Sequence, residues 1–110
     1  MHAPLPPEDH VFIKTEGQLV RINLSTIQWI EAQNDYMRIV TTAGRYLMHS
    51  TMKKLEERLP RPAFARVHRS FIVRIDQITN IEDTTIVIEQ QVIPIGASYR
   101  KHLFACLTIL

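Results

Sequence analysis

Short β-rich segments separated by tight turn signals are the feature of this sequence that most constrains its fold. Dipeptides typical of turns stand at Glu16-Gly17, Ala43-Gly44, Asp83-Thr84 and Gln90-Gln91. Connections this short join antiparallel strands, because a parallel pair needs a crossover of a dozen or more residues. The pattern therefore predicts a mainly β chain. The predicted strands are residues 11–15, 18–22, 27–31, 36–42, 45–48, 64–67, 71–75, 77–82, 85–89 and 92–95.

One helix is predicted in the middle of the chain, over residues 52–59. Met52, Leu55 and Leu59 recur at helical spacing, and charged residues occupy the positions between them. Ser50 is the expected N-cap, and Pro60 ends the helix.

A second helix is predicted near the C-terminus, with Ser98 as its expected cap. We expect its apolar residues to close the sheet and Cys106 to be a small buried hydrophobic residue. The apolar residues are Leu103, Phe104 and Leu107. A contact between part of this face and a partner domain, together with Ile109 and Leu110, stays open as an alternative. The two predicted helices lie far apart in sequence, which argues against a helix-turn-helix protein.

The composition is typical of one small globular domain, with 110 residues, of which 45% are hydrophobic and 22% charged. Residues 1–10 contain three prolines and are predicted to be a disordered lead-in or linker remnant, so the domain is expected at residues 11–110. The chain has no apolar run approaching the roughly 20 residues needed to cross a bilayer, and no signal peptide. We therefore expect no membrane contact and a cytoplasmic location, which a single cysteine also suits.

Positive charge is concentrated in two places, although the net charge is only +2. The sequence between residues 58 and 75 holds five arginines and no acid, and Arg100-Lys101-His102 forms a second basic cluster. A localised basic surface is what phosphate binding requires. Charge alone favours equally a solvated face whose compensating acids fold beside it. The five arginines are Arg58, Arg61, Arg66, Arg69 and Arg74.

Enzymatic chemistry finds no support in the sequence. No motif places a nucleophile beside a base, and with only three glycines there is no glycine-rich phosphate loop. The histidines are scattered without metal-ligand spacing. We therefore expect no catalytic residue, no metal and no cofactor. The histidines are His2, His10, His49, His68 and His102.

Four segments in order resemble the LytTR family of DNA-binding domains. They are the strand end and polar loop WIEAQNDY at 29–36, the helix at 52–59, the segment FARVHRSFIV at 64–73, and IPIG followed by SYR within 93–100. The likeness covers about residues 12–107. It implies an elongated stack of small antiparallel sheets with two short helices, whose loops enter successive major grooves of double-stranded DNA.

The resemblance also implies partners. The expected sites are imperfect direct repeats in promoters, each occupied by two protomers of a protein that is monomeric when free. In whole regulators of this family an N-terminal receiver domain is phosphorylated in a two-component system, and we expect such a receiver in a longer parent protein. The main alternative is a protein–protein interaction module that regulates a partner transcription factor.

The first candidate site is the loop at residues 34–38. Asn34 can contact adenine through two hydrogen bonds, and Arg38 can bind guanine or phosphate. Asn34 and Asp35 are also good turn-forming residues, so a purely structural role is the alternative. We expect Tyr36 to pack in the core.

The second candidate site is His68-Arg69-Ser70. The resemblance implies that the residue after the histidine faces the bases. Here this residue is Arg69, where the family often has another type, and its planar fork suits guanine. His68 is expected to make mainly structural hydrogen bonds. Ser70 can bind either phosphate or a neighbouring backbone amide.

The third candidate site is the start of the last helix. Helix N-termini attract phosphate, and Ser98 adds a hydroxyl group there. The resemblance places a DNA-contacting arginine at Arg100. Lys101 is expected to bind phosphate rather than to read a base. The alternative is an ordinary capped helix with a solvated first turn.

Overall fold

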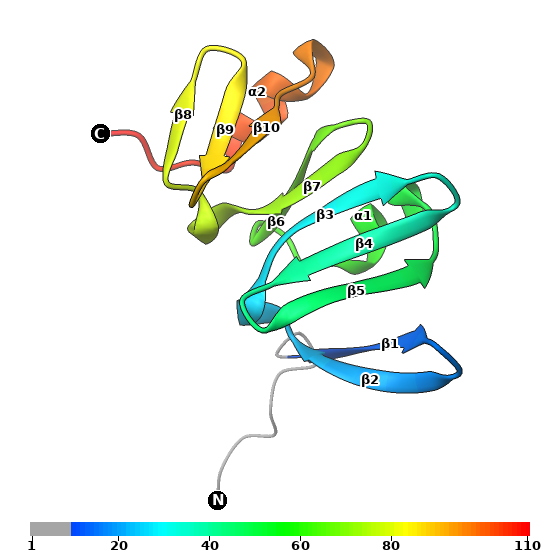
Figure 1. The fold of residues 1–110 in the computed structure, drawn as a ribbon. Helices are drawn as coiled ribbons and strands as arrows, with labels where there is room; N and C mark the ends of the chain where they lie inside the picture. The colour runs from blue at the N-terminus through cyan, green and yellow to red at the C-terminus, as the bar shows by residue number, and fades with distance from the viewer. Residues whose placement is uncertain (1–9) are drawn as a thin grey trace, which may run out of the picture.

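The computed structural model describes residues 10–110, which form three antiparallel sheets and two short helices (Figure 1). The predicted lead-in at residues 1–10 therefore lies outside the described residues, except His10, which begins the first strand. None of the helices in the described part is long and apolar enough to cross a membrane. The mainly β class with two short helices, predicted from the turn pattern, is confirmed.

The first sheet is a hairpin of strands β1 (His10–Thr15) and β2 (Gln18–Asn23). Its two-residue turn has positive φ at Glu16 (49°) and Gly17 (78°), the combination of the tight turn whose twist matches that of the flanking strands. Ile13 and Ile22 point into the core from the inner face of the hairpin.

The second sheet is the centre of the molecule and has five strands in the order β5-β4-β3-β7-β6. Ile30 pairs with Ile39 and Ile72, and this face is covered by the hairpin and by helix α1. Trp29 pairs with Val40 on the opposite face, which packs against the third sheet. Because side chains alternate along each strand, one sheet supplies both hydrophobic cores. The elements are β3 (Ile27–Gln33), β4 (Tyr36–Thr41), β5 (Gly44–His49), α1 (Met52–Arg58), β6 (Phe64–His68) and β7 (Phe71–Arg74).

The third sheet lies at the C-terminal end of the chain, with the order β10-β9-β8. It is followed by a 3-10 turn (Ala97–Tyr99) that continues directly into helix α2 (Arg100–Ala105). Ile86, Ile93 and Leu103 are completely buried between this sheet, α2 and the central sheet. Burial of each such side chain contributes roughly 1.5–3 kcal/mol. The strands are β8 (Asn80–Glu82), β9 (Thr85–Ile88) and β10 (Gln91–Pro94).

Three local predictions are wrong. The N-cap of α1 is Thr51, whose hydroxyl accepts from the amide of Lys54, and not Ser50. The strand predicted at 77–82 covers only 80–82, because Ile75–Gln77 forms a 3-10 turn that redirects the chain from the second sheet to the third. Ser98 lies inside the 3-10 turn before α2 and makes no capping hydrogen bond.

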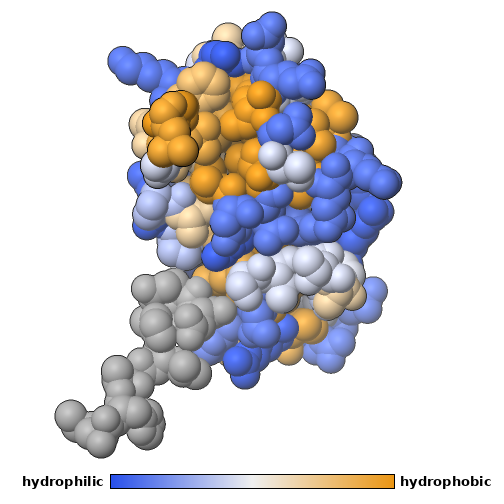
Figure 2. All heavy atoms as spheres, turned by 90° about the vertical axis from the view of Figure 1, so that its left-hand side faces the viewer, coloured by the Kyte–Doolittle hydropathy of each residue, from blue (hydrophilic) through white to orange (hydrophobic). Residues whose placement is uncertain are grey.

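Apolar side chains gather on the side of the molecule shown in Figure 2, over the end that carries the third sheet. Exposed large apolar residues of this part of the chain include Val92, Ile109 and Leu110. The β3–β4 and β6–β7 turns point to the other side, at the right of Figure 1. The apolar surface and these turns are therefore separate.

Candidate nucleic-acid interface

The β3–β4 turn presents Asn34 and Asp35 to solvent. Gln33 and Tyr36 close the hairpin as a cross-strand pair, so the connection contains only these two residues. Asn34 has φ of 57°, in the left-handed region that asparagine tolerates better than most residues. The two interpretations of Asn34 are thus compatible: its backbone makes the turn, and its amide group is free to face a ligand.

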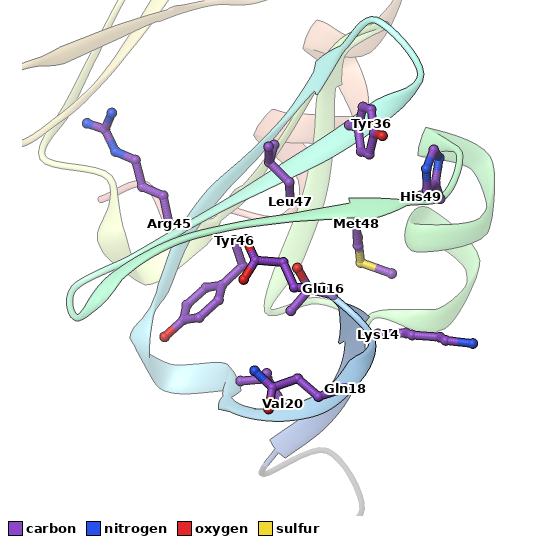
Figure 3. A pocket seen from close by; sticks show the side chains of 11 residues that line it. Lys14, Glu16, Gln18, Val20, Tyr36, Arg45, Tyr46, Leu47, Met48 and His49 are labelled. Atoms are coloured by element: carbon purple, nitrogen blue, oxygen red, sulfur yellow. The ribbon is translucent and has the colours of Figure 1, made fainter.

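Tyr36 is not a core residue, and the expectation that it packs there is wrong. Its side chain is 41% exposed and lies against the ring of His49, with 4.1 Å between ring centroids. Met37, its neighbour in β4, is the buried residue. Tyr36 and His49 stand at one end of a groove of about 640 Å³ between the hairpin and β5 (Figure 3).

Arg38 is engaged within the protein. Its Nη2 and Nε donate to one carboxylate oxygen of Glu31 at 2.6 and 3.0 Å. The two residues are cross-strand neighbours in β3 and β4, so their side chains lie on the same face. The indole of Trp29 also donates to this oxygen, at 3.4 Å. Arg38 is therefore near the turn, but its charge is balanced by an acid that sequence reasoning did not connect with it.

The β6–β7 turn holds His68, Arg69 and Ser70 together as one unit. The Nδ1 atom of His68 accepts from the amide of Ser70 at 3.1 Å, the structural role expected for this histidine. The carbonyl of Ser70 accepts from the amide of Ala32 at 2.9 Å, which ties the turn to β3. Arg69 is exposed at the tip, while its carbonyl accepts from Arg66.

The start of α2 presents Lys101 but holds Arg100. The Arg100 guanidinium donates to the carbonyl of Asp83 and lies over the ring of Phe104, 4.5 Å from its centroid. Lys101 and Ser98 are exposed. Helix α2 has only six residues, less than two turns, so its dipole attracts phosphate only weakly.

Backbone hydrogen bonds connect the three candidate segments. Ala32, near the β3–β4 turn, donates to Ser70 in the β6–β7 turn. Gly96, just before the 3-10 turn, donates to the carbonyl of Val67 at 2.8 Å. The β6–β7 turn is thus the central segment, with one candidate segment attached on each side.

The cluster of five arginines divides into two groups. Arg66 pairs with Glu56 at 3.3 Å, and Arg74 pairs with Asp76 at 2.8 Å. For these two, the alternative of compensating acids is correct. The other three are exposed, and only Arg69 of these lies in the β6–β7 turn. They are Arg58, Arg61 and Arg69. Among the residues described, no three histidines, cysteines or acids gather to hold a metal ion.

Comparison with known proteins agrees with this architecture. The family model described as the LytTr DNA-binding domain matches residues 17–108. A solved structure, the LytTr DNA-binding domain of a putative methyl-accepting/DNA response regulator from Bacillus cereus, superposes with a TM-score of 0.80. It is 23% identical in sequence, and the match covers 92% of this chain and 98% of that one. At this identity the likeness establishes the fold.

Curated relatives include the sensory transduction protein LytT of Bacillus anthracis and that of Bacillus cereus, each 32% identical over 100 residues. The match covers 86% of this chain but only 41% of either relative, so the chain spans less than half of their length. The family model covers most of the chain, so the class of this small mainly β module is that of a DNA-binding domain. The chain belongs to the LytTR family of DNA-binding domains.

Proposed function

We propose that this domain binds double-stranded DNA in a sequence-specific manner, as the output domain of a response regulator that controls transcription. The observation that carries the proposal is the connection of three exposed polar segments through the β6–β7 turn. The two connecting bonds are those from Ala32 to Ser70 and from Gly96 to Val67. Segments that are already held together lose less conformational entropy when they bind neighbouring parts of a groove than segments that move independently.

Each segment supplies a different contact in this proposal. Asn34 reads adenine, and Arg69 reads guanine through its planar fork. Lys101 binds phosphate, and Ser98 and Ser70 supply further hydroxyl donors from their own segments. His68 supports the turn from within. In this proposal the two base-reading turns make successive contacts along one face of the duplex, and the sites are imperfect direct repeats occupied by two protomers.

Arg38 and Arg100 enter the same proposal as residues that exchange partners. Each is held in the free protein, Arg38 by Glu31 and Arg100 by the carbonyl of Asp83. An arginine paired at the surface is stabilised by only about 0–1 kcal/mol, so a phosphate or a guanine edge can compete for it.

The proposal is tested by selecting bound sequences from random duplex DNA and measuring the affinity of the selected duplex across a salt series. A short enriched motif in direct repeat, with a steep loss of affinity as salt rises, is the expected result. Failure of the folded domain to enrich any motif would contradict sequence-specific binding.

A second candidate function is a protein–protein interaction module. The exposed apolar side chains Val92, Ile109 and Leu110 favour it. Contacts of this kind respond little to salt, because no counterions are released. Binding that stays constant between low and high salt would therefore support this function over DNA binding.

A further inference from the structure

Arg66 occupies the space between three elements that are distant in sequence. Its Nη2 donates to the carbonyl of Arg69 at 2.8 Å, and its Nε reaches the carbonyl of His68 at 3.4 Å. Its Nη1 faces the carboxylate of Glu56 on α1 at 3.3 Å. The guanidinium carbon lies 5.5 Å from the centroid of the Tyr99 ring. One side chain therefore contacts α1, the β6–β7 turn and the 3-10 turn before α2.

Tyr99 is itself fixed in place. Its amide donates to the carbonyl of Gly96 at 2.9 Å, and Gly96 donates to Val67 in β6. A β-carbon at position 96 would lie only 3.0 Å from the Tyr99 ring and 3.6 Å from the α-carbon of His68. The backbone of the β6–β7 turn, the ring of Tyr99 and the guanidinium of Arg66 are thus packed together closely.

We propose that Arg66 is a positioning residue of the interface, which fixes the β6–β7 turn against the start of α2 in the arrangement that lets Arg69 contact the bases of a duplex. The inference rests on the proposed DNA binding. We assign Arg66 a positioning role rather than a phosphate contact, because its Nε, Nη1 and Nη2 atoms all have partners within the protein and its side chain is only 18% exposed. It acts through the turn that carries Arg69.

Arginine is required for this role, and lysine cannot replace it. The planar guanidinium donates to two carbonyls in fixed directions while its face packs on an aromatic ring. A lysine ammonium has the same charge but can neither span both carbonyls nor stack. The Arg66→Lys variant therefore keeps the electrostatic attraction to DNA and loses the geometry.

Arg74 provides a matched control within the same sheet. It pairs with Asp76, donates to the carbonyl of Leu24 at 3.1 Å and lies 5.3 Å from the ring centroid of Phe64. Its side chain is 17% exposed, against 18% for Arg66. The two arginines thus have the same kinds of partners, but Arg74 is not in contact with the candidate DNA-binding turns.

The experiment compares Arg66→Lys and Arg74→Lys in the full chain, on the duplex obtained by selection. We expect Arg66→Lys to lose roughly ten- to a hundredfold in affinity for that duplex, with an unchanged salt slope and unchanged affinity for random DNA. We expect Arg74→Lys to bind DNA as the wild type does. The urea midpoint should decrease by a similar amount in Arg66→Lys and Arg74→Lys. Hydrogen exchange of the free protein should accelerate at residues 68–70 and 96–99 in Arg66→Lys alone.

Three outcomes would overturn the inference. Wild-type affinity in Arg66→Lys would show that the planar guanidinium group is not needed at this position. If Arg66→Gln lost affinity and had a salt slope shallower by about one unit, while Arg66→Lys kept the wild-type affinity, Arg66 would be a phosphate contact instead. An equal affinity loss in Arg74→Lys would reduce the effect to general destabilisation. Absence of any DNA binding by the wild type is a different result, because it contradicts the proposed function itself.

Discussion

The carboxylate of Glu31 and the guanidinium of Arg38 form the shortest ion pair among the described residues, with 2.6 Å between Nη2 and Oε1. The pair links β3 and β4 just below the turn that presents Asn34. It places an acid beside a proposed DNA-binding turn and neutralises Arg38, which lies two residues beyond that turn's closing pair. Under the proposed function, this pair therefore opposes DNA binding by the β3–β4 hairpin.

Replacement of Glu31 by glutamine is expected to strengthen DNA binding. The Glu31→Gln variant removes a negative charge that repels phosphate and releases Arg38 to bind it, so affinity rises and the salt slope steepens by about one unit. The free energy of unfolding should fall by less than about 1 kcal/mol, because the pair is partly exposed. Fluorescence anisotropy of a labelled duplex across a salt series measures the first effect, and urea unfolding the second.

Asp76→Asn is the control for this variant, because it removes another acid paired with an arginine, away from the β3–β4 turn. It changes the net charge equally but frees no arginine near Asn34. If both variants steepen the slope to the same extent, the effect of Glu31 is one of overall charge and Arg38 is not a contact.

The contribution of the Asn34 side chain can be separated from that of its backbone. Glycine adopts the positive φ of this position without strain, so Asn34→Gly keeps the turn and removes only the amide group. We expect a loss of about 1–3 kcal/mol in binding, with relaxed preference at one base pair. Glu16→Gly, at the positive-φ position of the β1–β2 turn, is the matched control and should leave binding unchanged. Selection from random duplexes with each variant would reveal whether the preference changes.

The strands were predictable because they depend on local patterns. The two-residue turn at Glu16-Gly17 and the alternation of residues in β4 identify antiparallel hairpins without knowledge of the rest of the chain. Which face of a strand is buried is less local. Core packing is expected for Tyr36, but a shift of one residue exchanges the two faces of a strand, and Met37 takes the buried position.

The candidate site was predictable in its exposed residues and not in its supporting ones. Arg69 and Lys101 stand in recognisable segments and are exposed, as a ligand-binding residue must be. Arg66 was visible only as one member of a basic cluster, because its partners Glu56 and Tyr99 come from other elements. Pairings of this kind depend on tertiary structure and leave no spacing signal in the sequence.

The N-cap of α1 gives a prediction about stability alone. Thr51 and Ser50 are adjacent and both suit an N-cap, but only the Thr51 hydroxyl accepts from the amide of Lys54, at 3.1 Å. Thr51→Ala should therefore lower the free energy of unfolding by about 1 kcal/mol, and Ser50→Ala by much less. Urea unfolding of the two variants decides between them. Equal losses would mean that the capping bond contributes nothing specific.

Lys101 and Arg69 are expected to affect DNA binding in different ways. Lys101→Ala should weaken binding to all duplexes alike and make the salt slope shallower by about one unit, because it loses one phosphate contact. Arg69→Ala should cost about 1–3 kcal/mol on the selected duplex and relax the preference at one base pair, because it loses a two-bonded guanine contact. Both side chains are exposed, so neither change should move the urea midpoint. Affinities for the selected duplex and for single-base variants of it, each measured at several salt concentrations, separate the two effects. A loss in Arg69→Ala that is the same on every duplex would make this arginine a phosphate contact, and sequence reading would then depend on Asn34 and Arg100.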